Sequence, residues 1–158
     1  MIFVTVGLHY QGFDRLIMKM DALAGTINEE VVMQIGSTKY KPKNARYFDF
    51  IDDDEVILRL FKDARVIVSH AGAGTLLNAL HFGKPIIAVP RQKIFEEHVD
   101  DQQLELTKAL SGNGQVAPVY DIEDLGSALR TVNTISSTRL DKNHNLITFL
   151  KRSLRGSE

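Results

Sequence analysis

The sequence of 158 residues contains no cysteine, which excludes disulfide bonds and zinc sites built from thiolates. It has no apolar run of about 18 residues, so the chain by itself is not expected to cross a bilayer. Residues 1–7 lack a basic region followed by a long apolar stretch, so no signal peptide is expected. Neither sign of charge dominates, because 19 Lys and Arg face 20 Asp and Glu, and this balance excludes a strongly basic nucleic-acid coat. We therefore expect one domain, in the cytosol or at the cytosolic face of a membrane.

Short apolar runs alternate with helical patterns along most of the chain. The runs are continuous rather than alternating, which is typical of parallel strands covered on both faces. The expected fold is α/β, a single Rossmann-like doubly wound sheet, in which ligands bind beyond the carboxyl ends of the strands. The predicted strands are residues 2–6, 31–35, 46–50, 66–70, 85–89 and 115–120, and the predicted helices are residues 13–23, 52–61, 75–82, 98–110, 122–132 and 141–154.

The chain divides into a domain at residues 1–132 and a linker with a C-terminal helix at residues 133–158. The helix carries an apolar face and a short basic cluster at its end. It can pack on its own domain, dock on a partner, or lie on an anionic membrane surface. The short cluster favours internal or partner packing. The residues concerned are Leu140, Ile147, Leu150 and Leu154 on the face and Lys151, Arg152 and Arg155 in the cluster.

A glycine-rich turn, Ser69–Thr75, follows the clearest predicted strand. Small residues let backbone amides approach a ligand, and the following helix offers free N–H groups and a positive dipole end. The turn thus suits a phosphate or diphosphate. In the alternative reading, Thr75 is only an N-cap and the glycines only tighten the turn. No Lys-Ser/Thr pair follows in P-loop spacing, and the third glycine of G-x-G-x-x-G would fall at Leu77.

The next predicted strand leads into a second polar stretch, residues 90–103. Gln102 and Gln103 carry paired donors and acceptors that suit sugar hydroxyls. Arg91, together with Lys93, can offset a diphosphate or a carboxylate. His98, Asp100 and Asp101 resemble metal ligands, but acidic residues at a helix start are explained by the helix dipole, and no metal is expected.

A third turn, Gly7–Asp14, enters a helix at the same edge of the sheet. It either leans over the ligand or only connects the strand to the helix. His9 is more simply a solvated loop residue than a general base, because no partner for it is evident in the sequence.

At these residues the sequence resembles the Alg13/PssE-type glycosyltransferase subunits, which are similar to the C-terminal, donor-binding half of MurG-like enzymes of the GT-B fold. The resemblance runs from Met1 to about Val132. The segments that carry it are Val4–Gly7 with Phe13–Ile17, Ser69–Thr75, Gly83–Pro90 and His98–Leu106.

The resemblance implies a UDP-sugar donor with its diphosphate at the glycine turn and its sugar against the paired glutamines. It implies no cofactor. GT-B enzymes need two Rossmann-like halves, so it also implies a membrane-anchored Alg14/PssD-like partner that brings a lipid-linked acceptor and holds this chain at the membrane. The predicted donor-binding residues are Gly7, His70, Gly72, Ala73, Gly74, Thr75, Asn78, Arg91, His98, Gln102 and Gln103.

Three departures from the family pattern stand out. Asn78 occupies the position where MurG-like and Alg13-like members place a ribose-binding Glu, and an amide bonds a hydroxyl without charge assistance. Gln102 stands where eukaryotic-type subunits often carry His, and the loop Leu8–Gly12 is longer than usual. With Arg91 and the run His98–Asp101, these features favour the bacterial PssE-type branch, which serves exopolysaccharide assembly and can use UDP-glucuronate.

The expected reaction is transfer of the sugar to an acceptor hydroxyl with inversion, the general base lying on the partner. The glycine-turn helix and Arg91 would stabilise the leaving diphosphate. Two alternatives remain at this stage: a non-catalytic nucleotide-sugar-binding or regulatory module, and an NAD-type oxidoreductase domain, which the missing third glycine disfavours. No nucleic-acid partner is expected.

Overall fold

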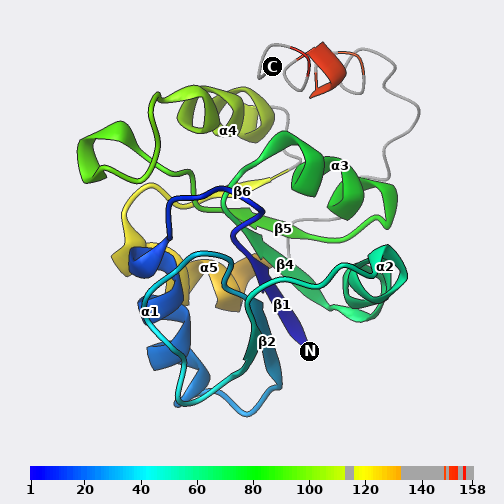
Figure 1. The fold of residues 1–158 in the computed structure, drawn as a ribbon, viewed down its shortest axis with the longest axis vertical. Helices are drawn as coiled ribbons and strands as arrows, with labels where there is room; N and C mark the ends of the chain where they lie inside the picture. Colours follow the sequence, from blue (N-terminus) through cyan, green and yellow to red (C-terminus); the bar gives the residue numbers. More distant parts are fainter. Residues whose placement is uncertain (113–115, 133–147, 149, 153–154, 156–158) are drawn as a thin grey trace.

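The computed structural model describes residues 1–112, 116–132, 148, 150–152 and 155. One sheet with helices on both sides organises this part of the chain (Figure 1). The strand order is β3-β2-β1-β4-β5-β6, with every pairing parallel, which is the doubly wound order of dinucleotide-binding folds. The strands are β1 (Ile2–Thr5), β2 (Val31–Gln34), β3 (Arg46–Phe48), β4 (Val66–Ser69), β5 (Ile86–Ala88) and β6 (Ala117–Pro118).

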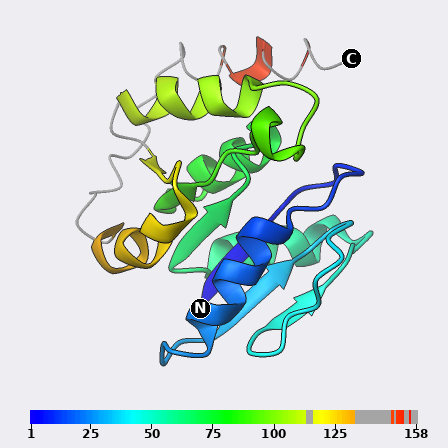
Figure 2. The same ribbon diagram turned by 90° about the vertical axis from the view of Figure 1, so that its left-hand side faces the viewer.

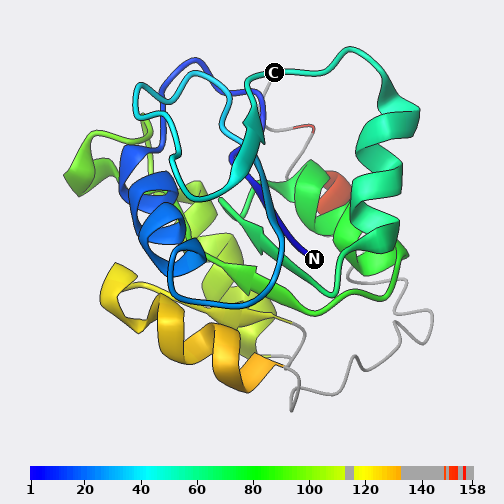
Figure 3. The same cartoon turned by 90° about the horizontal axis from the view of Figure 1, so that it is seen from below.

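Five α-helices and two short 3₁₀ turns are found in the described residues. Helices α1 and α5 cover one face of the sheet and α2, α3 and α4 the other, as Figures 2 and 3 show from two further directions. The bounds are α1 (Asp14–Ala24), α2 (Asp54–Asp63), α3 (Ala73–His81), α4 (Gln102–Gly112), α5 (Leu125–Thr131), η1 (Lys93–Phe95) and η2 (Ile122–Asp124).

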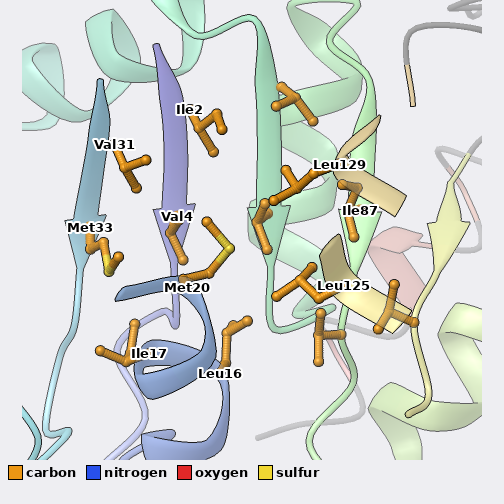
Figure 4. Packing of buried hydrophobic residues seen from close by; sticks show 14 of the residues in the cluster. Ile2, Val4, Leu16, Ile17, Met20, Val31, Met33, Ile87, Leu125 and Leu129 are labelled. Atoms are coloured by element: carbon orange, nitrogen blue, oxygen red, sulfur yellow. The ribbon is translucent and has the colours of Figure 1, made fainter. Parts of the chain in front are cut away.

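Burial on both faces explains the continuous apolar strands. In β1, Ile2 and Val4 point into the core under α1 and α5, whereas Phe3 points into the core under α2, α3 and α4. Figure 4 shows the first of these cores, where Leu16 and Met20 of α1 lie near β1. Successive side chains of the strand point to opposite faces of the sheet, but they are all apolar because helices cover both faces. The predicted Rossmann-like fold is confirmed.

The element boundaries differ from the predictions at several places. Helix α3 begins at Ala73, two residues before the predicted start, and α4 begins only at Gln102 because η1 and a loop come first. Within the described residues β6 spans only Ala117–Pro118, shorter than predicted. None of the described helices is long and apolar enough for a membrane span.

The predicted C-terminal helix lies mostly outside the described residues. Of its face, Leu150 is described, and it is fully buried in the core under α2, α3 and α4. The basic residues Lys151, Arg152 and Arg155 are exposed. Leu150 therefore packs on its own domain, and docking of a partner by this helix stays a prediction.

Candidate donor-binding site

Three turns meet at the carboxyl edge of the sheet. Thr5 at the end of β1 is paired with Ser69 at the end of β4, and Ser69 is paired with Ala88 at the end of β5. The turns that follow these strands therefore begin at the same level. The glycine turn after β4 lies in the middle, flanked by the loop after β1 and the loop after β5. This is the edge at which doubly wound folds bind their ligands.

The first turn of α3 presents unpaired backbone donors. Gly72 is the N-cap, no side chain caps the helix, and its first turn holds no acidic residue. The N–H groups of Ala73, Gly74 and Thr75 have no hydrogen-bond partner in the described part of the chain. Thr75 lies inside the helix, so the alternative reading of Thr75 as the N-cap is wrong. A helix of this length with a bare N-terminus is suited to an anion.

His70 is held tightly between two glycines. Its Nδ1 lies 3.2 Å from the carbonyl oxygen of Thr5, and because a carbonyl only accepts, Nδ1 carries the proton. A Cβ on Gly72 would lie 2.1 Å from Nε2 of His70, and one on Gly7 would lie 2.7 Å from the same atom. Both glycines are therefore required by the imidazole ring. Nε2 keeps a lone pair without a partner among the described residues, which suits a ligand hydroxyl or N–H rather than a phosphate oxygen.

The charge state of His70 follows from its burial. Burial lowers the pKa of His70 to about 3, and the nearby positive charge of Arg91 acts in the same direction. The folded protein therefore keeps the ring neutral where the unfolded chain, with a pKa near 6.5, takes up a proton. His70 contributes its full stabilisation above about pH 6.5 and loses it progressively as the pH falls towards 3.

Stability is expected to fall on mild acidification because of this ring. Between pH 7 and pH 5 the His70 contribution to the free energy of unfolding should drop by about 2 kcal/mol. Urea unfolding at both pH values measures it, and the His70→Gln variant should lose most of the pH dependence. An equal drop in wild type and His70→Gln would contradict this assignment.

Gly74 and Asn78 face open space on the same helix. A Cβ on Gly74 would meet no atom within 4 Å, so packing within the chain does not require glycine there. Asn78 is half-buried, and its side-chain amide has no hydrogen-bond partner among the described residues. It lies one helical turn after Thr75, so the amide is available to a ligand beside the helix N-terminus.

Arg91 is placed differently from the sequence expectation. Its side chain is fully buried and donates to the backbone carbonyls of Val6, Gln11, Gly12 and Glu97 at 2.9–3.2 Å. Burial lowers its pKa to about 10, so it remains cationic at neutral pH. In this arrangement the guanidinium is committed to the backbone and does not face a diphosphate or a carboxylate. Arg91 fastens the loop after β1 to the loop after β5.

A second arginine strengthens the same connection. Arg15 of α1 makes a bidentate ion pair with Glu97, with Nε–Oε1 at 2.7 Å and Nη2–Oε2 at 2.9 Å. The Arg15 guanidinium also lies over the ring of Phe95, 4.7 Å from its centroid. Glu97 is buried and accepts a further bond from the backbone N–H of Gln92. The loop after β5 is therefore fixed to α1 by charge-assisted bonds.

The remaining predicted residues of the second stretch lie around this loop. His98 lies next to His9, with ring centroids 4.7 Å apart, and its Nδ1 is 3.0 Å from Asp100. Gln103 accepts the backbone N–H of Arg91, whereas the side chain of Gln102 is exposed.

The acidic residues at the start of α4 are engaged by backbone. Asp100 accepts the N–H of Gln102, and Asp101 accepts the N–H of Lys93. The bond of Asp100 is the one expected of an acidic residue before a helix, whereas Asp101 closes the preceding loop. Within the described ranges, no group of three or more histidine and acidic side chains gathers to hold a metal ion.

The predicted site residues thus form two groups, one around His70 and one around Arg91. The turn at Val6 and Gly7 contacts both groups. Gly7 contacts the ring of His70, and the carbonyl of the preceding Val6 receives Arg91. Sequence reasoning missed a cleft of about 560 Å³ beside this turn, lined by residues that include Tyr10, Gln11, Arg15 and Phe95. Arg15 and Glu97 are 82 positions apart, so only the topology of the sheet identifies them as partners.

A comparison with known families decides what kind of domain carries this site. Residues 1–155 match the family described as the glycosyltransferase family 28 C-terminal domain. The chain belongs to that glycosyltransferase family. The expected kinship with MurG-like and Alg13-like proteins is thereby confirmed.

Relatives with curated names point in the same direction. The UDP-N-acetylglucosamine transferase subunit ALG13 of Debaryomyces hansenii is 29% identical over 91 residues, which cover 58% of this chain and 42% of that protein. The protein of the same name from Mus musculus is 32% identical over 124 residues, which cover 72% of this chain and 10% of that protein. This chain therefore spans less than half the length of these relatives.

Solved structures support the fold assignment. The crystal structure of MurG from Acinetobacter baumannii superposes with a TM-score of 0.61 at 17% identity. The match covers 95% of this chain but only 49% of that one. This glycosyltransferase family 28 domain therefore has the fold of one half of a GT-B enzyme.

Proposed function

We propose that this domain is the donor-binding half of a two-part inverting glycosyltransferase that moves a sugar from a UDP-sugar to a lipid-linked acceptor. The observation that carries the proposal is the bare N-terminus of α3, where the N–H groups of Ala73, Gly74 and Thr75 are unpaired and no acidic side chain competes. A diphosphate is a chemical group that such a helix end binds well. Membership in glycosyltransferase family 28 supports the proposal that this diphosphate is part of a nucleotide sugar.

In this proposal, each part of the donor has a counterpart in the site. The diphosphate accepts hydrogen bonds from the first turn of α3, and Asn78 is placed for a ribose hydroxyl. The neutral Nε2 of His70 accepts a donor group of the ligand. The exposed amide of Gln102 is available to the transferred sugar. Because both ALG13 relatives are named for UDP-N-acetylglucosamine, that donor is the first to test.

The reaction proceeds by attack of an acceptor hydroxyl oxygen on the anomeric carbon, while the bond from that carbon to the diphosphate oxygen breaks. The negative charge that develops on the leaving UDP is stabilised by the N–H groups at the start of α3. The hydroxyl proton passes to a base that we place on the acceptor-side subunit of Alg14/PssD type. That membrane-anchored subunit also holds this chain at the cytosolic face, in assembly of exopolysaccharide or another lipid-linked glycan.

Isothermal titration and a coupled transfer assay test the proposal together. The purified chain should bind UDP and UDP-N-acetylglucosamine but not NAD, and it should transfer sugar only when the acceptor-side subunit is added. Failure to bind any uridine diphosphate compound would overturn the proposal. Binding without transfer in the complete assembly would favour a regulatory module, and transfer by the chain alone would refute the division into two halves.

A further inference from the structure

Apolar side chains cluster on the two loops that flank the glycine turn. Five of the ten large apolar side chains that are exposed in the described residues belong to these loops, and Leu8 and Ile94 are 77% and 80% exposed. Scattered exposed apolar residues are ordinary, but a contiguous group marks a contact surface. We call the group the apolar rim; it consists of Leu8, Tyr10, Ile94, Phe95 and Val99.

The rim is one surface because its two loops are bonded to each other. The side-chain amide of Gln11 donates to the carbonyl of Glu96 at 3.3 Å, and the rings of His9 and His98 lie 4.7 Å apart. Beneath them, Arg91 donates to the carbonyls of Gln11 and Glu97. The two loops that carry the apolar side chains are therefore held together before any partner arrives, which lowers the entropic cost of binding.

The rim also borders the cleft described above. Tyr10 and Phe95 both line it, one from each loop, so the apolar rim forms part of the edge of a hollow of about 560 Å³ whose other side chains are polar or charged. Gln11 lines this cleft, and its Oε1 is buried without a hydrogen-bond partner in the described part of the chain. A buried acceptor of this kind is costly unless an incoming donor pairs with it. An apolar edge beside a polar hollow suits a protein surface that inserts a polar side chain.

The charge of the rim argues against a membrane as its occupant. The exposed charged side chains of residues 92–101 are one lysine, Lys93, and two carboxylates, Glu96 and Asp101, while half-buried Asp100 pairs with His98. The surface is therefore net acidic, whereas loops that insert into anionic lipid carry Lys and Arg.

We propose that the apolar rim is the docking surface for the acceptor-side half of the enzyme. The inference rests on the proposed function. This chain covers only 49% of the MurG chain on which it superposes, so the matched fold includes a second half that lies outside this domain. The rim flanks the donor turn on both sides, after β1 and after β5, which is where a second half must sit to close a cleft over the donor.

Two matched double variants test the proposal. Leu8→Ser with Ile94→Ser removes the two most exposed rim side chains, and Met18→Ser with Leu58→Ser removes two exposed apolar side chains from the outer sides of α1 and α2. Each is titrated with UDP and co-purified with the acceptor-side subunit. The rim variant should bind UDP within about twofold of wild type while its affinity for the subunit falls at least tenfold, about 1.4 kcal/mol. The control variant should match wild type in both measurements.

Each other outcome has a defined meaning. If the rim variant assembles as tightly as the control, or if wild type binds UDP but does not assemble, the docking proposal is overturned. Flotation of wild type with vesicles containing about 30% phosphatidylglycerol, lost in the rim variant, would replace the partner by a membrane. A dimer of wild type that the rim variant abolishes would replace it by a second copy of this chain. Absence of UDP binding in wild type would instead overturn the proposed function.

Discussion

Replacing Arg91 with alanine is expected to lower the free energy of unfolding by about 4 kcal/mol. The buried guanidinium satisfies four backbone carbonyls from two separate loops and also lies 4.9 Å from the ring centroid of Phe13. Without it, the carbonyls lose their donors inside a packed interface, and a cavity of side-chain size opens. A loss of this size is a large fraction of the total stability of a domain.

Two further variants test whether the lost hydrogen bonds of Arg91 cause this loss of stability. Arg91→Lys should recover only part of the loss, because one ammonium group cannot reach carbonyls that a planar fork serves from two nitrogens. Lys93→Ala, two positions away on the exposed side of the same loop, should change stability by less than about 0.5 kcal/mol. Urea unfolding monitored by circular dichroism gives all three values. Stability of Arg91→Ala within about 1 kcal/mol of wild type would contradict the structural role.

The Arg91→Ala variant also tests whether Arg91 selects the donor sugar. If Arg91 recognised a uronate carboxylate, its loss would weaken binding of UDP-glucuronate more than binding of UDP-glucose. Because the guanidinium is fully buried and committed to carbonyls, both should weaken by the same factor. Paired titrations with the two donors therefore separate the structural role from a ligand role.

Replacing Gly74 with alanine should raise the stability of the fold and lower its affinity for UDP. The glycine lies in a regular helix with open space beside it, so alanine is expected to stabilise the fold by about 0.5 kcal/mol. The added methyl group would occupy the space through which a diphosphate reaches the first turn of α3. Affinity for UDP should therefore fall about a hundredfold, near 2.7 kcal/mol.

Gly72→Ala is the matched comparison two residues earlier. Its methyl group would lie 2.1 Å from Nε2 of His70, so this variant should be destabilised by about 2 kcal/mol in the absence of any ligand. Thermal unfolding with and without UDP, together with titration calorimetry, distinguishes the pair. Unchanged UDP affinity in Gly74→Ala would place the diphosphate elsewhere.

The sheet and its helices could be predicted because both depend on local apolar patterns. Continuous apolar runs such as residues 66–70 identify buried parallel strands, and their spacing leaves room for the crossover helices. The start of α4 could not be predicted as well. The acidic residues before it suggest an earlier helix start, but the chain first forms η1, with Glu96 in a left-handed conformation. Asp101 is used to close that loop onto Lys93.

The candidate site likewise has parts that the sequence predicts and parts that only the fold shows. The glycine turn could be found from the sequence, because small residues between a buried strand and a helix are typical of ligand-binding turns in this fold class. The role of Arg91 could not, because an arginine in a polar loop is normally solvated, and only the fold shows four carbonyls converging on one point. The pairing of Arg15 with Glu97 likewise depends on the way α1 and the loop after β5 meet.

The turn at Val6 and Gly7 contacts both Arg91 and His70: Arg91 donates to the carbonyl of Val6, and Gly7 lies against the His70 ring. A displacement of the first loop should therefore also move the residues around His70 in the candidate donor-binding site. If the rim docks the acceptor-side half and the turn after β4 holds the donor, as proposed above, assembly and donor binding are linked through a single peptide unit, and each should alter the affinity of the other by the same factor.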